Sequence, residues 1–132
     1  MEAQRSLIKI IFLFTFLFSN AFAHSQECNN FICGKWENAE KNQTLEFFEI
    51  EKNKFEAKLV ETSLEHLKPH LNEWVIRQAK EENGGYYTDA KVHIIKRDLW
   101  LNAYIKKVDN NTIVIGGKIG HFSKEFRWKR IE

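Results

Sequence analysis

The sequence contains none of the short motifs that mark common enzyme classes. Its 132 residues include no Gly-x-Ser-x-Gly nucleophile motif, no glycine-rich phosphate-binding loop and no His-Glu-x-x-His motif. The carboxylates are numerous but scattered, which is typical of a solvated surface. These absences argue against the familiar hydrolase and nucleotide-binding classes, and we expect that the protein is not an enzyme.

Cysteine is scarce, with two residues in the chain, Cys28 and Cys33. Their spacing excludes a Cys-x-x-Cys redox motif, and no Cys/His set of zinc ligands lies nearby. His66 and His70 have the spacing of one helical face, but Pro69 between them interrupts a regular turn. We therefore expect no metal site and no cofactor.

Long apolar runs are also missing. The longest, residues 10–18, follows two basic residues and is nine residues long, whereas a membrane-spanning helix needs about 20. An Ala-Phe-Ala pattern ending at Ala23 is typical of signal peptidase cleavage. We expect residues 1–23 to be a cleavable signal peptide and residues 24–132 to be a single domain without a membrane anchor. The protein would then reside in the periplasm or outside the cell.

A strong excess of either charge is absent. Cleavage would remove two of the 20 basic and one of the 18 acidic residues, which leaves a net charge of +1. A near-neutral domain has no electrostatic reason to bind nucleic acid or an anionic membrane.

Export would place Cys28 and Cys33 in an oxidising compartment, where a disulfide is the default state. The bridge would close a loop of six residues, and its loop-closure entropy would contribute about 2 kcal/mol of stability. Two free thiols are the alternative.

Most apolar residues of the domain recur with the period of β-strands. The alternation predicts a hairpin from residues 45–50 and 55–59. Further strands are predicted at residues 92–94, 99–105, 112–115 and 122–128. Short strands separated by frequent turns favour a closed antiparallel barrel or a sandwich.

The middle of the domain has a different pattern. Thr62 and Glu65 have the spacing of a capping box, and Pro69 suits the first position of a helix. Apolar residues then recur at helical spacing at Leu71, Trp74, Val75 and Ala79. Because a glycine pair follows at residues 84–85, the pattern predicts one helix over residues 69–82.

Two short motifs resemble those of a known family. Gly34-Lys35-Trp36 opens the first strand, and a glycine-rich strand with Gly117 and Gly120 precedes Trp128-Lys129-Arg130. These motifs resemble those of small exported bacterial proteins with a lipocalin-like (calycin) barrel. The resemblance implies a mainly β fold, namely a small antiparallel lipocalin-like barrel. With the helix predicted above, the expected fold is such a barrel with one helix in the middle of the chain. The charged segment 62–82 replaces a family loop rich in Asp, Asn and Pro, so a ligand site that depends on that loop does not transfer.

The same resemblance implies structural roles for the motif residues. In calycin barrels a first-strand tryptophan closes one end, and a basic residue from the last strand packs over it. Trp36 and Arg130 would fill these roles, within about 6 Å of each other, and Trp128 shares the strand face of Arg130. Gly34 would let the chain bend around the indole, and the glycines of the later motif would allow strand coiling.

Aromatic residues form 14% of the chain, which is many for so small a domain. Core packing explains most of them, but a barrel of about eight strands can also hold one small ligand. The residues that we expect to line a pocket are Phe47, Phe55, Trp100, Tyr104 and Phe122. The leading hypothesis is therefore an exported binding module for a small apolar or amphipathic molecule. The alternative is a protein-interaction module, such as an inhibitor or an envelope assembly factor, that uses its outer face; an exposed helix over 69–82 would favour it.

Overall fold

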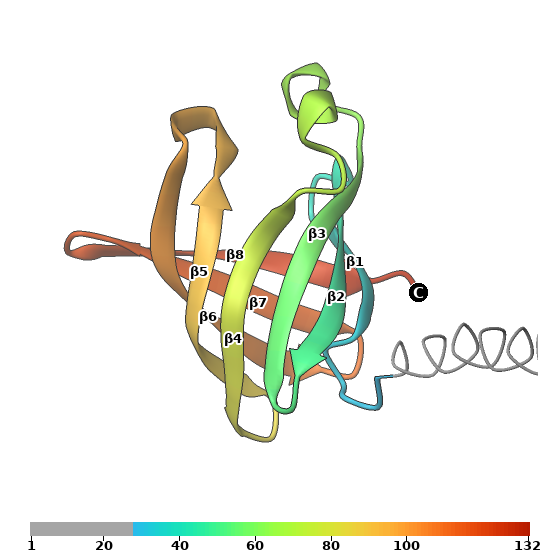
Figure 1. The fold of residues 1–132 in the computed structure, drawn as a ribbon, viewed down its shortest axis with the longest axis vertical. Coiled ribbons are helices and arrows are strands. Elements are labelled where there is room, and N and C mark those ends of the chain that lie inside the picture. The colour runs from blue at the N-terminus through green and yellow to red at the C-terminus, as the bar shows by residue number, and fades with distance from the viewer. Residues whose placement is uncertain (1–27) are drawn as a thin grey trace, which may run out of the picture.

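The computed structural model describes residues 28–132, which contain an eight-stranded antiparallel barrel (Figure 1). The predicted signal peptide lies outside the described residues. The strands are β1 (Gly34–Asn38), β2 (Gln43–Glu51), β3 (Lys54–Thr62), β4 (Trp74–Asn83), β5 (Tyr86–Ile94), β6 (Leu99–Asp109), β7 (Thr112–Ile119) and β8 (Phe122–Arg130). Each strand pairs with the next along the chain, and β1 pairs with β8 to close the barrel.

Two short 3-10 helices interrupt this up-and-down order. They are η1 (Glu65–His70), between β3 and β4, and η2 (Ile95–Arg97), between β5 and β6. Both segments project from the same end of the barrel as separate extensions (Figure 1). None of the helices in this described part of the chain is long and apolar enough to cross a bilayer.

The strands predicted from alternation are confirmed. β2 and β3 form the expected hairpin, with Asn53 at a positive φ of 67° in its turn, a conformation that asparagine tolerates better than most residues. β5, β6, β7 and β8 contain the other four predicted strand segments. Alternation succeeded here because one face of each strand packs in the barrel and the other meets water.

The helix predicted over residues 69–82 is wrong, because most of this segment forms β4. Val75, Ile76 and Ala79 are buried, an irregular spacing that imitates a helical stripe. The spacing arises from register shifts between β3 and β4 and from a positive φ of 63° at Gln78, since a bulge displaces side-chain parity by one residue. Pairing with both β3 and β5 outweighs the local helical preference.

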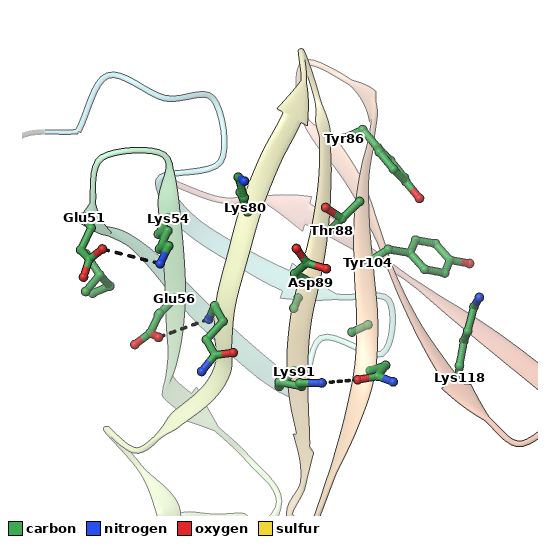
Figure 2. A pocket seen from close by; sticks show the side chains of 15 residues that line it. Glu51, Lys54, Glu56, Lys80, Tyr86, Thr88, Asp89, Lys91, Tyr104 and Lys118 are labelled. Carbon is green, nitrogen blue, oxygen red and sulfur yellow. Dashed lines mark hydrogen bonds and ion pairs between the residues drawn. The ribbon is translucent and has the colours of Figure 1, made fainter.

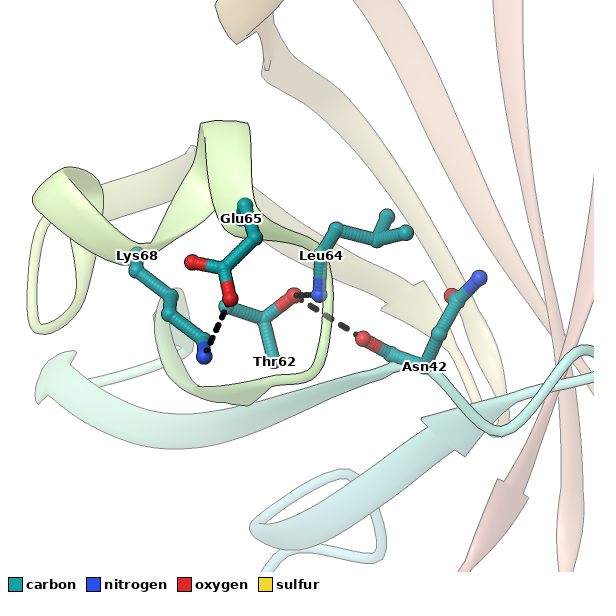
Figure 3. Close-up of polar contacts among 5 residues, drawn as sticks. All are labelled: Asn42, Thr62, Leu64, Glu65 and Lys68. Carbon is teal, nitrogen blue, oxygen red and sulfur yellow. Dashed lines mark hydrogen bonds and ion pairs between the residues drawn. The ribbon is translucent and has the colours of Figure 1, made fainter.

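The capping box expected at Thr62 and Glu65 is also absent. The Thr62 hydroxyl accepts a hydrogen bond from the Leu64 amide at 3.1 Å and donates one to the Asn42 carbonyl at 2.9 Å (Figure 3). Glu65 instead forms an ion pair with Lys68 at 3.0 Å. These contacts tie the β1–β2 turn to the segment that carries η1, at the end of the barrel where η1 and η2 project.

Candidate functional site

One end of the barrel is closed by the side chain of Trp36 in β1. The indole is fully buried, and its Nε1–H donates a hydrogen bond to the Ile32 carbonyl at 2.9 Å. The guanidinium carbon of Arg130 lies 4.4 Å from the centre of the ring, so the contact expected between these two residues is present. Arg130 also donates hydrogen bonds to the carbonyls of Phe31, at 2.7 Å, and Cys33, at 3.2 Å.

Gly34 begins the strand that carries this tryptophan, and its conformation requires glycine. Its φ is 128°, and a Cβ atom there would lie 2.5 Å from the carbonyl oxygen of Glu132. The C-terminal residues therefore pass against the start of β1, where Lys35 donates its amide to Glu132 at 3.0 Å. The first and last strands thus hold each other in place beside the closed end.

The segment before β1 packs into this closed end as a plug. Its two cysteines, Cys28 and Cys33, form the predicted disulfide, and Ile32 inside the loop is fully buried. The Asn30 side-chain oxygen accepts hydrogen bonds from the Tyr87 hydroxyl at 2.5 Å and from the Ile32 amide at 2.9 Å. The loop is therefore attached to β5 as well as to the indole.

Tyr87 lies fully buried beneath this loop. Burial raises the pKa of its hydroxyl above the ordinary value, and the nearby charge of Glu81 raises it further. The folded protein thus keeps Tyr87 protonated at a pH at which the unfolded chain ionises it.

Alkaline conditions should therefore destabilise the protein through Tyr87. The stabilisation of the protonated form is complete below about pH 10 and is lost as the pH rises, with a slope of at most about 1.4 kcal/mol per pH unit. Urea unfolding between about pH 9 and pH 12 should show a shallower decline for Tyr87→Phe than for the wild type. Tyr86→Phe is the matched control, and identical slopes for the wild type and Tyr87→Phe would contradict this assignment.

The half of the barrel next to the plug, called the lower half below, is filled by side chains. Phe55 and Tyr87 pack edge to face with ring centres 5.6 Å apart, and Phe47 is buried on the adjacent strand. Phe47 and Phe55, two of the residues expected to line a pocket, thus belong to this packed core.

The upper half of the barrel contains an open cavity of about 530 Å³. Every strand from β2 to β8 contributes an apolar side chain to its wall. These residues are Leu45, Leu59, Ile76, Val92, Leu101, Ile115 and Trp128. The η1 and η2 segments add Leu67 and Ile95 at the mouth. The cavity is therefore a concave apolar site at the end opposite the plug.

Several apolar side chains on the inner faces of the strands remain uncovered towards this mouth. On β8, Trp128, Phe126 and Phe122 share one strand face, and their exposed fractions rise from 9% to 51% to 79%. On β6, Leu99 lines the cavity and is 43% exposed. The barrel thus changes from a packed core to an unfilled apolar mouth over a few residues.

The five residues expected to form a pocket do not come together. Trp100 and Tyr104 lie on the outer face of β6, because Leu99, Leu101 and Ala103 take the inner positions. Trp100 stacks on His93 with ring centres 4.6 Å apart, and Tyr104 donates a hydrogen bond to Glu125. Phe122 lies near the tip of the β7–β8 hairpin, where Gly120 has a positive φ of 59°.

Most of the cavity wall consists of aliphatic residues, which a prediction based on aromatic residues did not include. Leu99 and Leu101 illustrate the missed signal: alternation within β6 already separated them from Trp100 and Tyr104. Choosing residues by their shared strand face rather than by aromatic character would have found them.

A second, larger hollow of about 1120 Å³ lies on the outer face of the barrel, lined by residues of β2 to β7 (Figure 2). Its lining is mainly charged and polar, and several of these groups bond to one another. Lys54 pairs with Glu51 at 3.7 Å, and Glu56 accepts the Gln78 amide at 3.2 Å. Because this lining is far less apolar than that of the barrel cavity, the barrel cavity is the better site for an apolar ligand. Residues 28–132 contain no cluster of three or more metal-ligating side chains.

The fold is similar to that of protein HP1028 from the human pathogen Helicobacter pylori, whose solved structure is described as belonging to the lipocalin family. The two structures match with a TM-score of 0.61 and 16% sequence identity, over 76% of this chain and 83% of that one. The predicted lipocalin-like barrel is thereby confirmed as a fold. No protein-family model matches the chain, and no curated protein sequence matches it.

Proposed function

We propose that the protein binds a small apolar or amphipathic molecule in the open half of its barrel. The observation that carries this proposal is the set of apolar side chains on the cavity wall that stay partly exposed to solvent, above all Phe126, 51% exposed, and Leu99, 43% exposed. A ligand that replaces water against such a surface gains free energy in proportion to the apolar area buried. The cavity volume of about 530 Å³ lies within the range of about 300–1,000 Å³ found for small-molecule sites.

The similarity to a lipocalin-family barrel supports binding rather than catalysis. The alternative of a protein-interaction module would have been favoured by an exposed helix over residues 69–82, but β4 occupies that segment. We further propose that the protein belongs to the small exported bacterial proteins whose motifs it resembles and that it works outside the cytoplasm. The signal-peptide pattern of residues 1–23 and the Cys28–Cys33 disulfide support this.

The proposal is tested by filling the cavity with a side chain. Gly117 lies on the cavity wall, and a Cβ atom there would meet only Val92, at an ordinary distance of 3.8 Å. Gly117→Leu should therefore project into the cavity and lower the affinity for the neutral fluorescent probe N-phenylnaphthylamine about tenfold or more. The melting temperature should stay unchanged or rise, because glycine within a strand costs backbone entropy.

Ser123→Leu provides the matched control for this substitution. Ser123 is exposed and pairs with Lys118 on the outer face of the same hairpin, one position along from Gly117. The control should bind the probe as the wild type does. Wild-type protein that fails to bind the probe, or Gly117→Leu that binds it with unchanged affinity, would overturn the proposed function.

A further inference from the structure

The charged residues around the cavity mouth are predominantly basic. The η2 segment contributes Lys96 and Arg97, and the inner face of β8 contributes Lys124. One carboxylate, that of Glu40, belongs to the lining of the same cavity. A chain with nearly balanced charge overall therefore places an excess of positive charge at one site.

Carboxylates near this group in the sequence do not neutralise it. Asp98 follows η2 directly, but its side chain lies 2.9 Å from His93. Glu125 lies next to Lys124 in the sequence, but it points to the outer face of β8, where it contacts Tyr104 and lies 3.7 Å from Lys106. In the described part of the chain, none of the three basic residues Lys96, Arg97 and Lys124 forms an ion pair.

Lys124 occupies the boundary between the apolar wall and the solvent. It shares the inner face of β8 with Phe122 and Phe126, and its Nζ lies 5.5 Å from the centre of the Phe126 ring. Its register partner on β7 is Gly117, which has no side chain to fill the space between them. A cation is thus placed directly above an apolar surface.

We infer that the ligand is an amphiphile with an anionic head, a carboxylate or a phosphate, that binds between η2 and β8 while its apolar chain enters the barrel. This inference rests on the proposed function and specifies the ligand class of the same site. Charge-assisted hydrogen bonds from Lys124, Lys96 and Arg97 hold the head at the mouth. The apolar chain of the ligand removes water from the mouth, and this strengthens the charge-assisted hydrogen bonds.

The experiment displaces bound N-phenylnaphthylamine with four amphiphiles that each have a twelve-carbon chain, all used below the concentrations at which they aggregate. Laurate and dodecyl phosphate carry an anionic head, dodecanol a neutral one and dodecylamine a cationic one. Each anion should compete about tenfold better than dodecanol, and dodecylamine should compete worst. The ratio of the affinities for laurate and dodecyl phosphate distinguishes a fatty-acid type of ligand from a phospholipid-derived one. Raised ionic strength should lower the affinity for both anions and leave the affinity for dodecanol unchanged.

Two variants test the basic residues directly. Lys124→Gln and the double variant Lys96→Gln/Arg97→Gln should each lower laurate affinity about three- to tenfold and leave dodecanol affinity unchanged. Lys118→Gln removes one positive charge from the outer face of the same hairpin, and laurate affinity should stay at the wild-type value.

Equal competition by laurate, dodecanol and dodecylamine would overturn the inference and leave the proposed function standing. An equal loss of laurate affinity in Lys118→Gln and Lys124→Gln would also overturn it. A failure of wild-type protein to bind the neutral probe would instead overturn the proposed function.

Discussion

Replacing Trp36 with alanine should lower the free energy of unfolding by about 3–5 kcal/mol, the usual cost of truncating a large buried aromatic residue. The indole is fully buried and contacts both the Arg130 guanidinium, 4.4 Å from its centre, and the Phe31 ring, 5.5 Å away. Its loss would also leave the Ile32 carbonyl without the hydrogen bond from Nε1. Equilibrium denaturation in urea measures the change.

Arg130→Ala should cost less, and the two losses should not add. Residues in direct contact couple by about 0.5–3 kcal/mol in a double-mutant cycle. Part of the Arg130 loss is independent of the indole, because the guanidinium also donates to the carbonyls of Phe31 and Cys33. Arg127→Ala, three residues earlier on β8, is the control, and it should show no coupling to Trp36→Ala. Strictly additive losses for Trp36 and Arg130 would show that their contact does not stabilise the barrel.

Removing the disulfide with Cys28→Ser/Cys33→Ser should destabilise the protein by at least about 2 kcal/mol, the loop-closure entropy of so short a loop. The loop also holds buried groups in place, because it carries Ile32 and the Asn30 side chain that bonds to Tyr87. An unrestrained loop must be ordered at additional entropic cost before these contacts can form. Urea unfolding of the double variant, and of the wild type with and without a reductant, measures the effect.

The same variant tests whether the closed end and the cavity of the barrel act independently. The plug and the cavity lie at opposite ends, with the packed layer of Phe47, Phe55 and Tyr87 between them. While the protein remains folded, loss of the disulfide should leave the affinity for N-phenylnaphthylamine unchanged. An unaltered free energy of unfolding would refute the stabilising role of the bridge, and a parallel loss of probe affinity would refute the independence of the two ends.

This division between a closed and an open end is compatible with both stability and the proposed ligand binding in so small a barrel. Large side chains fill the lower half, where Trp36 and the disulfide loop exclude water. The upper half leaves apolar residues such as Phe126 and Leu99 partly exposed. In the proposed function, a ligand that covers them would offset the cost of exposing them in the unbound protein.

Local rules were sufficient wherever a feature depends on neighbouring residues. Alternation predicted most strands because side chains in a strand point to opposite faces at every second residue. The close spacing of Cys28 and Cys33, together with the expected export to an oxidising compartment, predicted their disulfide. The Gly34-Lys35-Trp36 and Trp128-Lys129-Arg130 motifs pointed to the contact that the closed barrel makes between its first and last strands.

Features that depend on closure of the sheet were decided by the tertiary structure alone. The segment predicted as a helix became β4, because two neighbouring strands offered it hydrogen bonds that no local preference could outweigh. Alternation separated Leu99 and Leu101 from Trp100 and Tyr104, but closure determined that the leucines face the cavity and the aromatic residues face outwards. The basic mouth has the same origin: η2 and β8 are distant in the sequence and border one cavity only in the folded barrel. A sequence lists the two faces of each strand, and only the packing of all the strands decides which face becomes the inside.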